Sequence, residues 1–141
     1  MTTQEFWNKV KSPEYKVTQP RLAFADVLVQ NQDVMLSAES LYEKTKTIFP
    51  KTNLSTIYRN LESLERLNMI YKVTTDDGLN LYKLKCASNE HHHHIICTKC
   101  GKVLDIHFCP FDTFSELAGK AGFTITEHRL ELYGLCEDCR K

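Results

Sequence analysis

Four cysteines arranged as two Cys-x-x-Cys pairs constrain this chain more than any other feature. The pairs are Cys97/Cys100 and Cys136/Cys139, with 35 residues between them. Each pair can supply half of a tetrahedral Zn²⁺ site, because thiolates bind zinc at about 2.3 Å. Gly101 directly follows the second thiolate and allows a tight backbone turn there. We therefore predict a closed structural zinc site that the fold assembles from both pairs; two separate redox dithiols are the alternative.

A run of four histidines, which begins at His91, points to a second metal. Successive side chains of a strand point to opposite faces, so His91 and His93 would face one way and His92 and His94 the other. The run can therefore serve two separate sites. Cys86 lies slightly upstream, and a thiolate with two imidazoles suits Zn²⁺ better than Fe²⁺ or Mn²⁺. The alternatives are a solvated polar patch for the histidines and a buried apolar role for the cysteine.

The bulk composition fits a cytoplasmic globular protein. The chain has 141 residues, of which 42% are apolar and 26% charged. No stretch approaches the ~20 apolar residues of a membrane span, and the N-terminus lacks the pattern of a secretory signal. In the cytoplasm, six cysteines are expected as metal ligands or redox thiols and not as disulfides.

Charge argues against a strong non-specific binder of polyanions. The 18 basic and 18 acidic residues give a formal net charge of zero. Residues 1–85 carry a net charge of +2 and residues 86–141 a net charge of −2. This small segregation favours the first half as the part that contacts nucleic acid.

The first part of the chain is expected to be helical. We predict a short helix over Thr3–Lys11 and a second with Thr18 as its N-cap and Pro20 in its first turn. A third helix is expected to begin after Ser37 and to end at Pro50.

A fourth helix has one apolar and one polar face. The apolar residues recur at spacings of three, four and three, which is typical of a helix that packs one face inward: Leu54, Ile57, Leu61 and Leu64. The other side of its N-terminal part offers hydroxyls, a phenol and a guanidinium, from Ser55, Thr56, Tyr58 and Arg59. Such groups suit the base edges and phosphates of a DNA groove.

Two strands should follow this helix, at about Met69–Thr75 and Leu79–Lys85, and the Asp-Asp-Gly sequence between them predicts a hairpin turn. Helices followed by such a hairpin are the outline of a winged helix-turn-helix. A small helical bundle with an attached hairpin fits the pattern equally well. We assign residues 1–85 to this domain and residues 86–90 to a hinge.

The remaining residues, 91–141, alternate strand-like and helical segments and form an α+β domain. Strands are expected at residues 92–96 and 102–106, a helix over Phe111–Ala121 and a strand over Phe123–Tyr133. Gly122 would adopt the left-handed conformation that ends a helix. The whole chain is therefore predicted to be an α+β protein with two domains.

Three other side chains have both a functional and a structural interpretation. His128 fits a structural histidine on a strand, and Asp112 fits the first turn of a helix, where the dipole favours acidic groups. Cys109 precedes Pro110 at a helix start, where its pKa would be lowered, unless it is buried and inert. No nucleophile–base arrangement, carboxylate pair or phosphate-binding glycine loop stands out. The chain is therefore not expected to be an enzyme.

Five segments together resemble the ferric-uptake-regulator family of bacterial metal sensors, and within it most closely the zinc-uptake regulators. The segments are YKVTQPR at residues 15–21, SAESLY at 37–42, STIYRNLESL at 55–64, HHHHIICTKCGKV at 91–103 and LYGLCEDC at 132–139. The resemblance covers almost the whole chain. It implies a homodimer with an N-terminal winged helix that binds operator DNA and a C-terminal dimerisation domain.

The resemblance also implies roles for individual residues. The structural zinc ligands would be Cys97, Cys100, Cys136 and Cys139. The ligands of a regulatory zinc at the hinge would be Cys86, His92 and His94. A further site, occupied in some members, would use His91, His93, Asp112 and His128. Tyr58 and Arg59 match contact positions of the DNA-reading helix, and Lys16 and Arg21 match residues that approach the DNA backbone or minor groove.

Two positions depart from the family pattern. Met35 stands where iron and peroxide sensors have a histidine, which, together with the presence of Cys86, favours zinc over iron. Lys72 matches the position of a fourth, often carboxylate, ligand, and a protonated lysine cannot bind a metal. Asp76, Asp77, Asp105 or water remain as candidates for this ligand.

These observations predict a dimeric, zinc-responsive transcriptional repressor. A regulatory Zn²⁺ would fix the angle between the DNA-reading heads and the dimer core, so that two recognition helices match major-groove half-sites. The resemblance implies an AT-rich inverted repeat near zinc-uptake genes. The alternatives are an iron, manganese or peroxide sensor of the same family, or a thiol redox switch that a structural zinc stabilises. A zinc enzyme would need an open metal position beside a general base, and no such base is evident.

Overall fold

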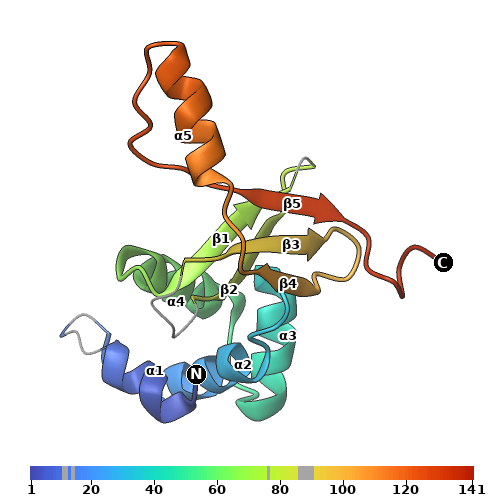
Figure 1. Cartoon of the computed structure of the whole chain (residues 1–141). Coiled ribbons are helices and arrows are strands. Elements are labelled where there is room, and N and C mark those ends of the chain that lie inside the picture. The colour runs from blue at the N-terminus through green and yellow to red at the C-terminus, as the bar shows by residue number, and fades with distance from the viewer. Residues whose placement is uncertain (11–12, 14, 76, 86–90) are drawn as a thin grey trace. The chain divides into compact units, whose positions relative to one another are not determined.

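The computed structural model describes residues 1–10, 13, 15–75, 77–85 and 91–141 (Figure 1). The chain divides into two compact units, Met1–Ser88 and Asn89–Lys141. Within the described residues there are five helices and five strands, which confirms the mixed α and β class. The segment predicted as a hinge, residues 86–90, lies outside the described residues. None of the described helices has the length and apolar character needed to span a bilayer.

Four helices begin the first unit, each after a side chain that caps its N-terminus. They are α1 (Thr3–Lys9), α2 (Gln19–Gln30), α3 (Ala38–Ile48) and α4 (Leu54–Arg66). The capping residues are Thr2, Thr18, Ser37 and Asn53, whose side-chain oxygens accept hydrogen bonds from backbone N–H groups of the first turn. The predicted caps at Thr18 and Ser37 are thereby confirmed.

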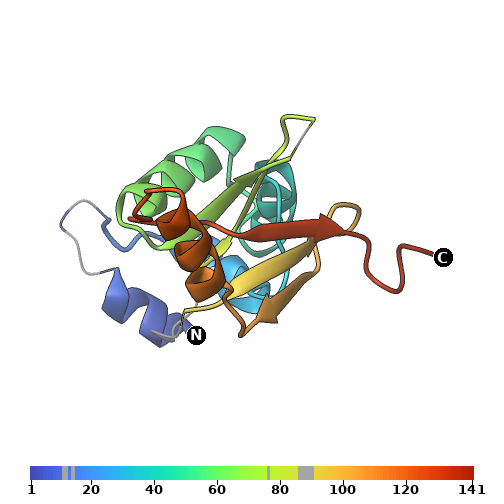
Figure 2. The ribbon, with the colours of Figure 1, turned by 45° about the horizontal axis from the view of Figure 1, so that its top comes forward.

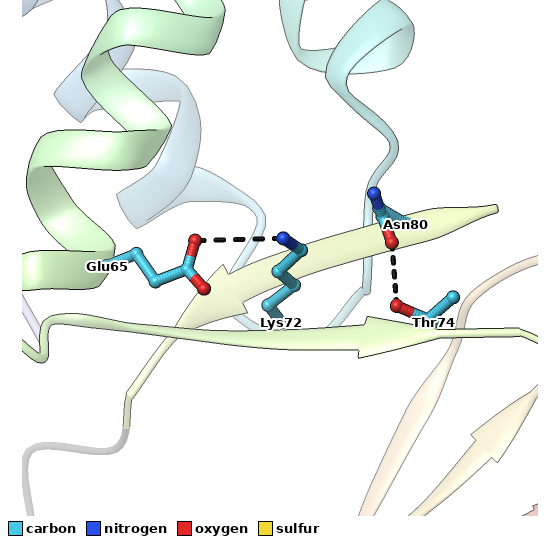
Figure 3. Close-up of polar contacts among 4 residues, drawn as sticks. All are labelled: Glu65, Lys72, Thr74 and Asn80. Carbon is cyan, nitrogen blue, oxygen red and sulfur yellow. Dashed lines mark hydrogen bonds and ion pairs between the residues drawn. The ribbon is translucent and has the colours of Figure 1, made fainter. Parts of the chain in front are cut away.

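A hairpin of β1 (Ile70–Thr74) and β2 (Asn80–Leu84) completes the first unit. The strands pair antiparallel, and Gly78 in the turn has φ +84°, which a glycine adopts without strain. The Thr74 hydroxyl donates a 2.7 Å hydrogen bond to Asn80 opposite it (Figure 3). A single β-bridge between Leu36 and Tyr82 ties the loop between α2 and α3 to this hairpin.

The core of the first unit is a continuous cluster of apolar side chains from its helices and hairpin. Its fully buried members include Phe6, Phe24, Leu41, Ile57, Leu61, Leu64 and Leu84. Three of the four residues predicted for the apolar face of α4 are therefore buried. The exception is Leu54, the first residue of α4, which is 36% exposed because the helix end extends past the cluster.

A three-stranded sheet forms the centre of the second unit. Its strands are β3 (His93–Cys97), β4 (Val103–Ile106) and β5 (Glu131–Gly134), in the order β4-β3-β5. The pairing of β3 is antiparallel with β4 and parallel with β5. A parallel neighbour needs a crossover connection, and α5 (Phe111–Lys120) lies within that connection.

The crossover differs from the sequence prediction in one respect. A strand was expected over Phe123–Tyr133, but only Glu131–Gly134 pairs with β3. Residues 123–130 precede the paired region and meet no strand within the described residues, so the ladder that would define a strand there is missing. Gly122 has φ +82°, as predicted for a residue that ends a helix.

α5 stands away from the sheet of its own unit. It is the orange helix of Figure 1, where it lies apart from β3, β4 and β5, and in Figure 2 it lies to the left of these strands. Among the described residues, α5 packs against no other helix or strand, and none of its residues is buried. Within the described part of the second unit, Phe114 and Leu117 of α5 are therefore left exposed.

Candidate functional site

The parallel pairing of β3 and β5 explains how the two Cys-x-x-Cys pairs meet. Cys97, the last residue of β3, is in register with Gly134, the last residue of β5, so the two segments leave the sheet at the same end. The Thr98 backbone N–H donates a 2.9 Å hydrogen bond to the carbonyl of Gly134 and holds the two exits together. Gly101 turns the first pair back into β4 with φ +79°, as expected from its place after the second thiolate.

The four sulfur atoms of Cys97, Cys100, Cys136 and Cys139 all lie within 4.8 Å of one another. The Sγ atoms of Cys100 and Cys136 are 3.7 Å apart, which is far longer than a disulfide bond. It is close to the roughly 3.8 Å expected between sulfurs bound about 2.3 Å from one tetrahedral Zn²⁺. Hydrogen bonds from the backbone N–H groups of Cys100 and Cys136 lower the pKa of Cys97 to about 6, which favours its thiolate form. This donor set fits a closed zinc site.

A second group contains His94 of β3, Asp105 of β4 and His92, which directly precedes β3. Nε2 of His94 is 3.3 Å from Oδ1 of Asp105, which is its register partner across the strand pair. The rings of His92 and His94 have centroids 5.0 Å apart, and the ring of His107 lies 5.5 Å from that of His92. Two imidazoles and a carboxylate are a set that can bind a divalent metal.

The other residues considered from the sequence as ligands or ligand positions for this group lie in different parts of the chain. Cys86 and Asp76 lie outside the described residues. Asp77 accepts a hydrogen bond from Thr75 in the hairpin turn. The ammonium of Lys72 lies 3.9 Å from the Glu65 carboxylate of α4, so it contacts an acidic side chain of the first unit (Figure 3). Within the second unit, the structure places Asp105 beside His92 and His94.

A third group lies on the opposite side of the same histidine run. Its members are His91, His93, Cys109 and His128, whose ligand atoms also lie within 4.8 Å of one another. Three of these four residues were expected here from the family resemblance. The fourth was expected to be Asp112, which instead lies exposed in the first turn of α5, outside this group. Cys109 occupies its place.

Alternation along β3 accounts for the separation of the two histidine groups. His91 and His93 join one group, while His92 and His94 join the other, as predicted for successive residues of an extended chain. Burial lowers the pKa of His93, and the charges of His91 and His128 lower it further. His93 therefore favours the neutral form that binds metals.

The polar side of α4 is the candidate DNA-reading surface of the first unit. Ser55, Tyr58 and Arg59 are exposed, and Thr56 is half-buried. The Asn53 side chain accepts hydrogen bonds from the hydroxyls of both Ser55 and Thr56, at 2.6 and 2.9 Å. Their oxygen lone pairs remain as acceptors. Arg59 makes one long contact, 3.5 Å, to Ser55 among the described residues.

Tyr58 is held by a residue that the sequence did not single out. Its phenol donates a 3.2 Å hydrogen bond to Glu39 in the first turn of α3, and this bond raises the pKa of Tyr58. The phenol thus has a fixed direction and remains a possible hydrogen-bond acceptor. Nothing in the sequence around Glu39 distinguishes it from other exposed acidic residues in helices.

Arg21 serves partly as a structural link. Its Nε donates a 3.1 Å hydrogen bond to buried Asn60 of α4, and its Nη1 donates one of 3.0 Å to the carbonyl of Lys16. The guanidinium also lies 4.3 Å from the centre of the Tyr15 ring. Arg21 therefore fixes the segment that carries the exposed Lys16 against α4, and two of its five N–H donors are used in these bonds to described residues.

Comparison with known proteins identifies the family of this chain. The model of the ferric uptake regulator family matches residues 12–133. A ferric uptake regulation protein of Bacillus subtilis is 35% identical over 133 residues, covering 93% of this chain and 89% of that relative. The peroxide operon regulator of the same organism is 30% identical over 139 residues, with coverage of 98% and 93%.

A solved structure supports the same assignment. The ferric uptake regulator of Francisella tularensis, solved with iron, has a TM-score of 0.74 and 29% identity, and the match covers 93% of this chain and 98% of that one. The match extends over both units and agrees with a DNA-binding N-terminal part and a dimerising C-terminal part. This chain belongs to the ferric uptake regulator family, whose members are dimeric, DNA-binding, metal-responsive transcription regulators and not enzymes.

Proposed function

We propose that this protein is a zinc-responsive repressor of the cytoplasm, which binds operator DNA of zinc-uptake genes when a regulatory Zn²⁺ is bound. The observation that carries the proposal is the group of His92, His94 and Asp105, to which the sequence adds the thiol of Cys86 six residues before His92. Two imidazoles, a carboxylate and a thiolate would complete a four-coordinate zinc site.

The donor set favours zinc over the metals of the other sensors. Fe²⁺ and Mn²⁺ prefer more oxygen and nitrogen ligands and a higher coordination number, whereas a thiolate favours Zn²⁺. Met35, which stands where iron and peroxide sensors have a histidine, is 3% exposed and belongs to the apolar core. That position therefore offers a thioether packed among apolar side chains in place of an imidazole.

Metal binding is proposed to act through the segment that joins the two units. Ligands on both sides of residues 87–90 would restrict this connection when they share one ion. A restricted connection would favour the arrangement in which two copies of α4 meet successive major-groove half-sites. The metal shifts the population only by the ratio of its affinities for the competent and incompetent forms.

The nearest alternative is a sensor of iron, manganese or peroxide. The names of the Bacillus subtilis relatives favour it, as does the carboxylate of Asp105, a ligand that iron and manganese also accept. A thiol redox switch is a further alternative that would rely on the cysteines. The metals can be separated directly by measuring DNA binding.

The test uses full-length protein that retains zinc in the four-cysteine site and an operator selected from a random duplex library. Zn²⁺, Fe²⁺ and Mn²⁺ are titrated separately under anaerobic conditions, and operator affinity is followed by fluorescence anisotropy. We expect Zn²⁺ to raise the affinity at free concentrations far below those needed for the other two metals.

Cys86→Ser is the matched variant for this test. It should lose most of the response to Zn²⁺ and keep the zinc of the four-cysteine site. If Fe²⁺ or Mn²⁺ activates the parent protein better than Zn²⁺ does, or if Cys86→Ser responds like the parent, the zinc assignment is wrong. A chain whose affinity responds to peroxide and to none of the metals would instead be a redox switch.

A further inference from the structure

The ligand atoms of His91, His93, Cys109 and His128 lie close enough together to share one cation. Nε2 of His91 lies 3.1 Å from Nε2 of His93 and 2.9 Å from Nε2 of His128. The sulfur of Cys109 lies 3.2 Å from that same nitrogen of His128. Ligand atoms around one Zn²⁺ are expected roughly 3.3–3.6 Å apart, so one ion would fit among these four atoms after shifts of a few tenths of an ångström.

Hydrogen bonds alone do not account for this convergence. A ring nitrogen carries either one hydrogen or one lone pair, so it makes one good hydrogen bond. Nε2 of His91 has two ring nitrogens as neighbours and can satisfy only one of them. A cation at the centre would accept a lone pair from each ring and would remove the conflict.

Two of the rings are held in place by neighbours that are not ligands. His93 is buried, and its ring hydrogen-bonds the backbone of Leu130, which is the type of contact that orients a metal-binding imidazole. The ring of Phe111 lies 5.0 Å from that of His128. The ligand atoms are thus positioned by the fold around them.

We propose that this group is a closed Zn²⁺ site in which the Cys109 thiolate is the fourth ligand. Three imidazoles and one thiolate are a soft, four-coordinate set that suits zinc and not iron or manganese. A ligand set with Asp112 in place of Cys109 would contain a harder oxygen ligand and would leave the coordination sphere more open. Because all four positions are filled by protein, the ion would stabilise structure and would not activate water.

The site also explains how the crossover of the second unit is held. His93 is the first residue of β3 and His91 lies just before it, Cys109 comes directly before the turn into α5, and His128 follows α5. Since α5 packs against no other element among the described residues, these ligands are where its two ends are joined to the sheet. Zinc binding would therefore fix the two ends of the segment that contains α5.

This inference is independent of the zinc-sensing proposal, because it concerns different ligands and is tested without DNA. The test uses the full-length Cys86→Ser protein with zinc in the four-cysteine site, which leaves Cys109 as the single thiol outside that site. Co²⁺ is added as a spectroscopic probe. We expect a near-ultraviolet absorption band of sulfur-to-cobalt charge transfer that saturates at one additional ion with a sulfur ligand.

Two further substitutions in this background decide which residue is the ligand. Cys109→Ser should abolish the band and weaken binding at the site at least tenfold, whereas Asp112→Asn should leave both unchanged. The proposal is overturned if the Cys86→Ser protein shows no band, if the band survives Cys109→Ser, or if Asp112→Asn removes it. Retained zinc and an unchanged far-ultraviolet circular dichroism spectrum check that each variant is folded.

A second measurement leaves Cys109 intact and so avoids any effect of the substitution on folding. In the same Cys86→Ser protein, Zn²⁺ should slow alkylation of Cys109 at least tenfold and should slow hydrogen exchange in residues 110–127. Alkylation at the same rate with and without Zn²⁺ would show that Cys109 is not a ligand.

Discussion

The two units of this protein are stabilised in different ways. The first unit buries a continuous apolar cluster, in which Phe6, Phe24, Leu41, Ile57 and Leu64 are fully enclosed. The second unit buries little apolar surface, and none of the residues of its α5 is fully buried. Many of its large apolar residues are exposed: Leu104, Phe108, Phe114, Leu117, Phe123, Leu132, Tyr133 and Leu135.

The difference shows what each unit needs in order to fold. A unit of about 50 residues rarely builds a sufficient core alone and depends on metals, disulfides or oligomerisation. The second unit contains all three groups of potential metal ligands among the described residues, together with uncovered apolar surface. We infer that metal ions and a second copy of the chain supply what its core lacks, whereas the first unit is stable through its own packing.

The largest expected effect comes from the four-cysteine site. Cys97→Ser should remove the tightly held zinc and unfold the second unit, because structural zinc contributes roughly 10 kcal/mol or more to folding in small domains. Zinc content per chain and segment-resolved hydrogen exchange measure both outcomes. Lys99→Ala, which alters an exposed residue between the same cysteines, is the control. Unchanged exchange in β3, β4 and β5 of the serine variant would contradict the account.

The reciprocal change lies in the core of the first unit. Leu64→Ala should destabilise that unit by about 2–5 kcal/mol, because it leaves a cavity where a fully buried side chain was. Zinc content of the second unit should stay unchanged. Leu54→Ala, on the same helix but 36% exposed, should have a much smaller effect on thermal unfolding. Loss of zinc from Leu64→Ala would show that the units do not fold independently.

The exposed apolar face of α5 should contribute to dimerisation. The double substitution of Phe114 and Leu117 by serine should weaken the dimer at least ~100-fold, since burial of each such side chain contributes about 1.5–3 kcal/mol and each acts in both copies. Sedimentation equilibrium measures the change. Glu116→Gln, on the same helix and paired with exposed Lys120, is the control. A double variant that dimerises like the parent would place the dimer interface elsewhere.

The smallest expected effect is on DNA contact by α4. Arg59→Ala should weaken operator binding roughly tenfold and lower the slope of log affinity against log salt by about 1, as loss of one phosphate contact does. Metal content should not change. Arg66→Ala, at the other end of the same helix, should bind like the parent. Equal losses in the two variants would argue against the N-terminal part of α4 as the reading surface.

Features set by local sequence were predicted well. The caps at Thr18 and Ser37, the left-handed Gly122 and the hairpin turn depend on residues close together in the chain, so composition and spacing were enough to find them. The family relationship was also visible in the sequence motifs. The chain's mixed class followed from the change of periodicity between its two halves.

Features set by contacts between distant residues were predicted less well. A strand was expected over Phe123–Tyr133, but only Glu131–Gly134 pairs with β3, and local sequence does not show where such a pairing begins. Cys109 contacts His128 because the segment after α5 runs back toward the residues that precede α5. From the sequence, Cys109 was notable only for its place before Pro110 at a helix start. The bond from Arg21 to Asn60 likewise joins two helices, and no spacing rule connects them.

The most direct test of this comparison is hydrogen exchange of the full-length protein, followed segment by segment before and after a strong chelator removes its metal. We expect exchange to rise throughout β3, β4, β5 and α5, while the buried segments of α2 and α4 keep their protection. If both units lose protection together, or if the second unit stays protected without metal, then metal is not what holds the second unit together.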